Sequence, residues 1–169
     1  MCRYYTQCVE WFVLDSSSLI TLARADALDL LVLAPHAAIT VSAVYRETVE
    51  TAALKAHAEA REIARCFDEK QIVIRDPRRR TPVPGVSRVD STVIRLAEEL
   101  GAADLLTNDR ALLRKAEQRG LRASFTAEFV LRLCAADRIA RQRQDELFRA
   151  FIAHRRYSAQ FLEALTLGA

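Results

Sequence analysis

Four acidic residues follow short apolar segments or loops at the points where helical patterns begin. Asp15 comes directly after the apolar segment 11–14, and Asp109 lies just beyond a second such segment at 105–106. Glu47 and Asp90 fall in the first turns of two helical patterns. Oxygen donors with no Cys or His at ligand spacing are typical of sites for hard divalent cations. The pattern therefore indicates a carboxylate site for Mg²⁺ or Mn²⁺.

Each acid also has a simpler interpretation, because an acid near a helix N-terminus is stabilised by the helix dipole and by capping. Glu50, one helical turn further on, is an alternative to Glu47. Single caps do not explain why four acids reach one edge of a sheet. Their mutual repulsion is unfavourable unless cations neutralise it.

Two divalent ions about 4 Å apart activate a water on one side of a phosphorus and stabilise the leaving oxygen on the other. This chemistry needs neither a histidine base nor a serine nucleophile. The three histidines are isolated from one another in sequence, and no Ser-His or Cys-His arrangement is evident. The four cysteines form no Cys-x-x-Cys pair, so we expect reduced thiols and no zinc site.

The elements that must position these acids alternate between strands and helices. Short apolar segments at 11–14, 37–41, 71–74, 105–106 and 121–125 are separated by helical patterns, of which Val89, Val93, Leu96 and Leu100 form the clearest. This alternation predicts an α/β fold with a parallel sheet covered on both faces, whose ligands lie beyond the carboxyl ends of the strands. We expect a first domain over 1–126 and a C-terminal helical extension, 127–169, packed on it.

Composition narrows the class of protein. The 169 residues are 51% hydrophobic and 28% charged, which excludes disordered and low-complexity chains. No apolar run approaches the ~18 residues of a membrane helix, and residues 1–10 lack the apolar core of a signal peptide. We therefore expect a soluble cytoplasmic protein that does not enter a membrane.

Arginine supplies most of the positive charge. It accounts for all but three of the 25 basic residues, and the formal net charge is +3. Guanidinium groups pair in a two-pronged way with phosphate, which suits a phosphodiester partner. A GC-rich genome would give the same arginine bias.

Four segments resemble the successive motifs of PIN-domain proteins, in family order and at family-like spacing. They are residues 12–20, 39–47, 90–101 and 103–110, and the resemblance extends over 11–126. The most specific part runs from the helix opened by Asp90 to Thr107-Asn108-Asp109. The tail 135–167 is similar to the C-terminal helices of a PIN subgroup.

The resemblance implies a three-layer α/β/α fold and a Mg²⁺- or Mn²⁺-dependent nuclease that acts on RNA and leaves a 5′-phosphate and a 3′-hydroxyl. Many relatives are VapC-like toxins, so an antitoxin protein and a second copy of the chain are candidate partners. The acids that match the family's metal-binding and catalytic quartet are Asp15, Glu47, Asp90 and Asp109, with Glu47 as ligand or as orienter of the attacking water. Ser17 and Thr107 match small hydroxylated positions beside them, and Asn108 stands where some relatives have a further Asp.

Candidate substrate contacts are basic. Arg78, Arg79 and Arg80 lie in the loop before Asp90, and Arg110 begins the helix after Asp109. A basic loop at the mouth of an acidic site would contact phosphates without reading sequence. A solvated surface loop is the alternative interpretation.

Two other functions fit parts of the pattern. A magnesium-dependent phosphatase would have an Asp-x-Asp nucleophile pair, but Ser17 stands where the second acid would be. A non-catalytic PIN-fold binding module would not require four converging acids. The sequence therefore favours a metal-dependent ribonuclease.

Overall fold

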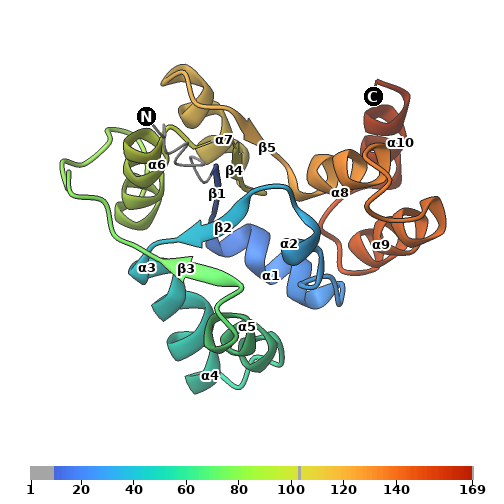
Figure 1. Cartoon of the computed structure of the whole chain (residues 1–169), viewed down its shortest axis with the longest axis horizontal. Helices are drawn as coiled ribbons and strands as arrows, with labels where there is room; N and C mark the ends of the chain where they lie inside the picture. Colours follow the sequence, from blue (N-terminus) through green and yellow to red (C-terminus); the bar gives the residue numbers. More distant parts are fainter. Residues whose placement is uncertain (1–9, 103, 169) are drawn as a thin grey trace, which may run out of the picture.

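A five-stranded parallel sheet lies at the centre of the molecule (Figure 1). The computed structural model describes residues 10–102 and 104–168. The strand order is β3-β2-β1-β4-β5, and every neighbouring pair is parallel. The strands are β1 (Trp11–Leu14), β2 (Ala37–Thr40), β3 (Ile72–Ile74), β4 (Asp104–Leu106) and β5 (Ala123–Ser124).

Helices cover both faces of the sheet, which confirms the predicted three-layer α/β/α fold. They are α1 (Ser16–Arg24), α2 (Leu30–Leu33), α3 (Ser42–Tyr45), the π-helix η1 (Arg46–Thr51), α4 (Ala52–Leu54), α5 (Glu59–Asp68), α6 (Arg88–Leu100), α7 (Arg110–Gln118), α8 (Thr126–Ala135), α9 (Arg141–Ala153) and α10 (Ala159–Leu167). Helix α1 packs with α5 and η1, whereas α6 packs on β1 and α7 on β5.

Strand β1 is central, and its register decides which residues meet at the carboxyl edge. Leu14 of β1 pairs with Leu106 of β4, so the residues that follow them, Asp15 and Thr107, leave the sheet side by side. The strand is short and apolar, and Val13 and Leu14 are fully buried because helices cover both faces of a parallel sheet. Because the apolar strand ends at Leu14, Asp15 lies at the carboxyl edge of the sheet, next to Thr107.

Helix α6 follows the predicted pattern closely. Ser87 caps its start by accepting a hydrogen bond from the Asp90 amide at 3.0 Å. Val93 and Leu96 are buried on one face, and Gly101 ends the helix at a left-handed φ of 56°. Because the helix runs back to the start of β4, its first turn, with Asp90, lies towards the carboxyl edge of the sheet.

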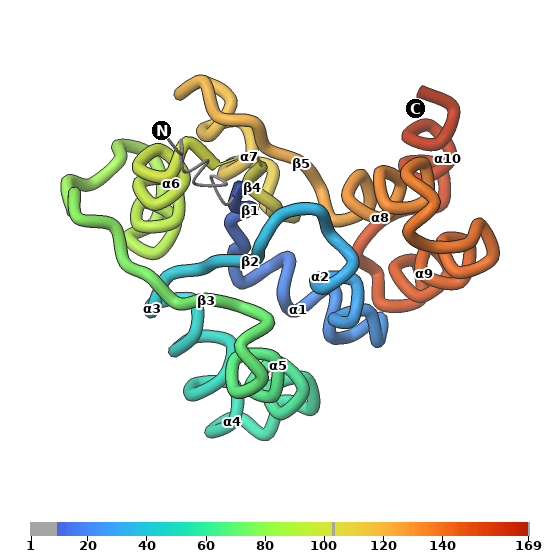
Figure 2. Tube along the Cα trace, viewed as in Figure 1, coloured from blue at the N-terminus to red at the C-terminus, as the bar shows by residue number. Residues whose placement is uncertain are grey.

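The C-terminal helices extend the same hydrophobic core. Phe129 of α8 packs on Phe12 of β1 with ring centroids 5.7 Å apart, and the buried cluster continues through Leu147 and Phe151 to Leu162. Figure 2 shows α8, α9 and α10 gathered at one side of the molecule. The division at residues 126 and 127 stays a prediction.

One segment departs from simple helix. Residues 46–51 form a π-helix, which inserts an extra residue into the turn and which periodicity does not reveal. Among the described residues, no helix is both long and apolar enough to cross a bilayer.

Candidate active site

The Asp15 carboxylate is the centre of the carboxyl edge. Asp15 is 4% exposed and caps α1, where its Oδ1 accepts the Ser18 amide at 2.7 Å. Its Oδ2 accepts two hydroxyl hydrogen bonds, from Ser17 at 2.7 Å and from Thr107 at 2.6 Å. The sequence-predicted pair, Ser17 and Thr107, therefore lies directly on Asp15.

These two hydroxyls are oriented by backbone amides. The Asn108 amide donates to Ser17 Oγ at 2.7 Å, and the Asp109 amide donates to Thr107 Oγ1 at 3.0 Å. Since each hydroxyl oxygen already accepts a hydrogen bond, its single proton is directed to Asp15. The β4 exit thus builds a rigid donor set around one carboxylate.

The charge of Asp15 has no cationic partner among the described residues. Its hydrogen-bond donors are two hydroxyls and a backbone amide, all neutral. Burial raises the pKa of Asp15 above its ordinary value, against the opposing effect of the hydrogen bonds from Thr107, Ser18 and Ser17. A buried carboxylate stabilised only by neutral donors is electrostatically favourable for a bound cation.

Asp109 lies at the same exit and caps α7. Its Oδ1 accepts the amides of Ala111 at 2.7 Å and Leu112 at 3.1 Å. Its Oδ2 accepts no hydrogen bond from the described part of the chain, and the side chain is exposed. Asp109 is thus both a cap and a carboxylate with one oxygen available.

Glu47 comes to this edge from η1. Ser16, the residue after Asp15, donates its hydroxyl to Glu47 Oε2 at 2.6 Å. Glu50 is exposed and has no such contact within the described residues. The structure therefore places Glu47, and not its alternative, beside the exit of β1.

The four acids are not drawn together into a closed cluster. Over residues 10–102 and 104–168, no three His, Cys, Asp or Glu side chains lie in a metal-binding arrangement. Asp90 lies half-buried in the first turn of α6, and within that part of the chain its carboxylate oxygens accept no hydrogen bond. Three of the four acids, Glu47, Asp90 and Asp109, are at least partly exposed and can turn.

The donor set nonetheless fits a hard divalent cation. Asp15 is fixed and retains an unused lone pair on Oδ1, while Glu47, Asp90 and Asp109 each keep an oxygen free of hydrogen bonds to the described residues. All these atoms are carboxylate oxygens, as Mg²⁺ and Mn²⁺ prefer. The Asp15 carboxylate is therefore held in one orientation, whereas the other three acids can change rotamer.

Comparisons with known proteins identify the family of the chain. A family model described as a PIN domain, DUF3368, matches residues 11–167. The chain belongs to the PIN-domain family. A solved structure of a PilT N-terminus domain protein from the hyperthermophilic archaeon Sulfolobus solfataricus P2 is similar at 17% identity and a TM-score of 0.48, covering 72% of this chain and 92% of that one. No curated protein matches the chain. PIN domains are generally nucleases.

Two residues at the edge of this PIN domain were not singled out as functional by the sequence. Asn108 donates its side-chain amide to Ser17 O at 3.2 Å, Thr21 Oγ1 at 2.8 Å and Thr126 Oγ1 at 2.9 Å. Its Oδ1 accepts the hydroxyl of Tyr157 from the C-terminal extension. The only sequence signal for Asn108 was its position between Thr107 and Asp109, and none marked Tyr157.

A basic groove of about 910 Å³ opens between α3, η1 and the start of α6 in the PIN domain, and none of the four predicted acids lines it. We define it by Ser42, Arg46, Asp76, Arg79, Arg80, Arg88 and Thr92. Arg46 precedes Glu47, and Arg88 is two residues before Asp90. Although partial burial opposes it, hydrogen bonds from Ser42, with the charges of Arg80 and Arg46, hold the pKa of Asp76 below its ordinary value.

Only two of the three arginines of the predicted basic loop lie at this groove. Arg79 and Arg80 line it, whereas Arg78 is not among its lining residues. The Arg78 amide donates to Glu99 Oε2 at 2.7 Å, and its guanidinium lies 3.9 Å from the same carboxylate. Arg110 is exposed on α7 and does not line the groove either. Arg46 and Arg88, which the sequence did not single out, take their place.

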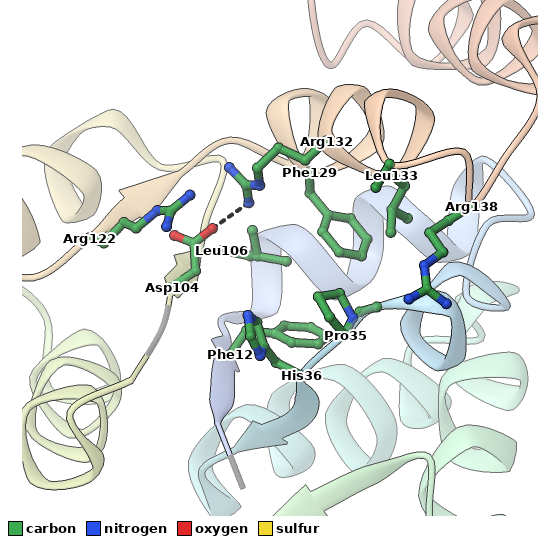
Figure 3. Close-up of a pocket in the computed structure, with 12 residues that line it drawn as sticks. Phe12, Pro35, His36, Asp104, Leu106, Arg122, Phe129, Arg132, Leu133 and Arg138 are labelled. Carbon is green, nitrogen blue, oxygen red and sulfur yellow. Dashed lines mark hydrogen bonds and ion pairs between the residues drawn. The ribbon is translucent and has the colours of Figure 1, made fainter. Parts of the chain in front are cut away.

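A second cavity, of about 250 Å³, lies at the opposite, amino edge of the sheet (Figure 3). It contains a different buried carboxylate, Asp104 at the start of β4, which forms an ion pair with Arg132 and accepts the Ser124 hydroxyl at 2.6 Å. Phe12, Phe129 and Leu133 form its apolar wall. None of the four predicted acids lines this cavity.

Proposed function

We propose that this PIN domain is a Mg²⁺- or Mn²⁺-dependent endoribonuclease whose site is the carboxyl edge of the sheet. The observation that supports it most is the buried Asp15 carboxylate, which is held by neutral donors only. Burying an uncompensated charge is unfavourable, and a divalent cation would offset that cost. Glu47 and Asp109 at the same edge, and Asp90 in the first turn of α6, would supply further oxygen ligands.

The four acids would have two kinds of role. Asp15, Asp90 and Asp109 would hold the metal, and Glu47 would be a further ligand or orient the attacking water. A bound divalent ion supplies an activated water and stabilises the leaving oxygen. By donating to Oδ2, Ser17 and Thr107 oppose the rise in the pKa of Asp15 that burial causes, and they fix the direction of its carboxylate. Cleavage would leave a 5′-phosphate and a 3′-hydroxyl.

The basic groove supports a nucleic-acid strand as substrate. Arg46, Arg79, Arg80 and Arg88 form no ion pair within the described residues, so their guanidinium groups remain available for phosphate. Within residues 10–102 and 104–168, no aromatic side chain lines the groove, which leaves contact with the nucleic-acid backbone as its main mode of binding. We expect affinity for single-stranded RNA with little dependence on base sequence from these contacts.

The decisive experiment is cleavage of labelled single-stranded RNA and DNA by purified protein with Mg²⁺, with Mn²⁺ and with EDTA. The test variant is Asp15→Asn combined with Asp109→Asn, and the matched control is Asp104→Asn at the other edge. We expect cleavage of RNA that EDTA and the double variant abolish and that the control retains. Cleavage that persists in EDTA, or in the double variant, would reject this metal site.

A toxin role follows from the same activity and has its own test. If the protein is the toxin of a pair in the cytoplasm, its induced expression arrests growth through RNA cleavage, whereas Asp15→Asn is harmless at equal expression. An antitoxin partner would then co-purify from cells that express the neighbouring gene, and size-exclusion chromatography would show whether two copies associate. Growth arrest by the Asp15→Asn variant would separate toxicity from the cleavage site.

A further inference from the structure

We propose that Tyr157 is a positioning residue for the carboxyl-edge site: its hydroxyl fixes the Asn108 side chain, and Asn108 fixes the Ser17 hydroxyl on Asp15. The C-terminal extension would then belong to the catalytic unit and not only to the core. The consequence for cleavage rests on the proposed function, whereas the link from Tyr157 to Ser17 is testable without it.

The ring of Tyr157 is held on three sides by aromatic residues. It stacks on Phe161 with centroids 5.3 Å apart and planes 10° apart, and it meets Phe151 edge-on at 5.5 Å and Phe125 edge-on at 6.3 Å. These partners come from α9, α10 and the residue before α8. The packing therefore directs the hydroxyl at the exit of β4, and if one of the three contacts is weakened the other two still hold the ring.

The hydroxyl of Tyr157 has two assigned partners. It donates to Asn108 Oδ1, and it accepts the Ala127 amide at 3.3 Å. Burial raises the pKa of Tyr157, so the hydroxyl keeps its proton at neutral pH. A protonated phenol has one proton to donate, and the acceptor that it meets is the amide oxygen of Asn108.

Asn108 converts that one contact into a fixed orientation. Its Oδ1 also accepts the Thr126 amide at 3.2 Å, while its Nδ2 donates to Ser17 O at 3.2 Å and to Thr21 Oγ1 at 2.8 Å. Oδ1 faces two hydrogen-bond donors and Nδ2 faces acceptors. A 180° flip of the Asn108 amide would therefore place donors against donors and acceptors against acceptors. Removal of the Tyr157 hydroxyl takes away one of the two donors that set this orientation.

The last step reaches the carboxylate. The backbone amide of Asn108 donates to Ser17 Oγ, and that hydroxyl donates to Asp15 Oδ2, each over 2.7 Å. Asn108 thus contacts Ser17 twice: its side-chain amide donates to the Ser17 carbonyl oxygen, and its backbone amide donates to the Ser17 hydroxyl. If Asn108 shifts, the Ser17 hydroxyl loses its direction, and Asp15 loses one of the two hydroxyl donors to Oδ2.

The first experiment uses Tyr157→Phe in the full chain, which removes the hydroxyl and keeps the ring. We expect about a tenfold lower kcat for RNA cleavage, the loss equivalent to one hydrogen bond, with KM unchanged because the groove is untouched. The structural control is Phe161→Leu, which weakens the same aromatic packing and leaves the hydroxyl in place. It should lower the melting temperature with little change in kcat.

The second experiment tests the route through Asn108. In an Asn108→Ala background, Tyr157→Phe should have no further effect on kcat, because its effect passes through the missing amide. If the loss of kcat in the double variant equals the product of the two single losses, Tyr157 does not act through Asn108 and the proposed link is wrong. A loss in Phe161→Leu as large as that in Tyr157→Phe would also overturn the link, since packing alone would then explain both.

A third measurement needs neither metal nor activity. In ¹⁵N-labelled protein with EDTA, the side-chain amide signals of Asn108 and the backbone amide of Ser18 should shift in Tyr157→Phe and stay in place in Phe161→Leu. Unchanged Asn108 signals in Tyr157→Phe would overturn the positioning role. Wild-type protein that cleaves nothing, combined with the expected shifts, would instead reject the proposed function and keep the link.

Discussion

Two buried aspartates lie at opposite edges of the same sheet and are stabilised in different ways. Asp15 follows β1 at the carboxyl edge, and Asp104 begins β4 at the amino edge; they are 4% and 6% exposed. Burial raises the pKa of both carboxyls. Each accepts a short hydrogen bond from a serine hydroxyl, Ser17 at 2.7 Å and Ser124 at 2.6 Å respectively. Their depth in the protein therefore does not distinguish them.

What distinguishes them is the presence of a cation. Arg132 forms an ion pair with Asp104, and the same guanidinium donates to Ser124 Oγ at 3.0 Å. Asp15 has three neutral donors and no cationic side chain as partner among the described residues. The protein thus supplies a counter-charge for Asp104 from its own sequence, and the described residues supply none for Asp15. We infer a structural pair at one edge and a metal ligand at the other.

The largest expected effect separates the two edges by cleavage. Asp15→Asn keeps the acceptor for the Ser18 amide but removes the charge, so metal-dependent RNA cleavage should fall by at least about 100-fold. Asp104→Asn should leave the rate of folded protein within about threefold, because that carboxylate lies at the other edge. Initial rates at saturating Mn²⁺ measure both. Equal losses in the two variants would remove the distinction.

The next largest difference between Asp15→Asn and Asp104→Asn should be in the thermal stabilisation that bound metal gives. Free Mn²⁺ at about 100 times its dissociation constant would stabilise wild-type protein by about 2.7 kcal/mol, and the same shift should appear in Asp104→Asn. Asp15→Asn should lose most of the shift. Differential scanning fluorimetry with and without Mn²⁺ measures it, and calorimetric titration gives the dissociation constant. A full shift in Asp15→Asn would place the ion elsewhere.

In EDTA, the two substitutions should change stability in opposite directions. Asp104→Asn leaves Arg132 without its carboxylate and should cost about 1–3 kcal/mol. Asp15→Asn removes a buried charge that no cation compensates and should stabilise by about 1 kcal/mol, or roughly 2–4 °C for a domain of this size. Urea unfolding of the three proteins at pH 7 tests the signs. Destabilisation by Asp15→Asn would mean that its charge is already compensated.

The fold was predictable because its determinants are local. The apolar segments at 11–14 and 37–41 became β1 and β2 with nearly the predicted bounds, and the period of Val93 and Leu96 gave α6. The weak strand predicted at 121–125 is only Ala123–Ser124. The π-helix at 46–51, which packs against α5, could not be foreseen, because helical periodicity gives no signal for an extra residue in one turn.

The site was predictable only where it follows from strand exits. Asp15 and Thr107 meet because β1 and β4 are neighbours; the alternation of elements predicts a parallel sheet, whereas this strand order comes from the structure. The link from Tyr157 to Asn108 joins residues 49 positions apart, and only the tertiary fold brings them together. Arg78 looked equivalent to Arg79 and Arg80 in the sequence, but Glu99 on α6 binds it outside the groove. Ion pairs between distant elements decide which arginines remain available.

Substrate affinity offers a smaller test of the same contrast between edges. Arg46→Gln with Arg88→Gln removes two guanidinium groups from the basic groove and should raise KM for RNA severalfold. It should also lower the slope of log affinity against log salt by about 0.7 for each phosphate that the groove no longer neutralises. The matched control is Arg122→Gln with Arg138→Gln at the amino-edge cavity, with the same change in net charge. Identical slopes in the two double variants would show that overall charge, and not the groove, binds RNA.

The smallest effect is the pH dependence of the stability difference between wild type and Asp15→Asn in EDTA. Burial raises the pKa of Asp15 in the folded protein above its ordinary value of 3.8. Above the folded-state pKa, ionisation in the buried site opposes folding; as pH falls through that pKa towards 3.8, protonation relieves the cost. The gain from Asp15→Asn should therefore be largest near neutral pH and shrink on acidification. The stabilisation by Mn²⁺ should also shrink on acidification, because Mn²⁺ binds only the ionised carboxylate and its affinity falls as the proton competes. A gain that is constant with pH would show that Asp15 titrates as it does in the unfolded chain, and the electrostatic contrast with Asp104 would then have to rest on Arg132 alone.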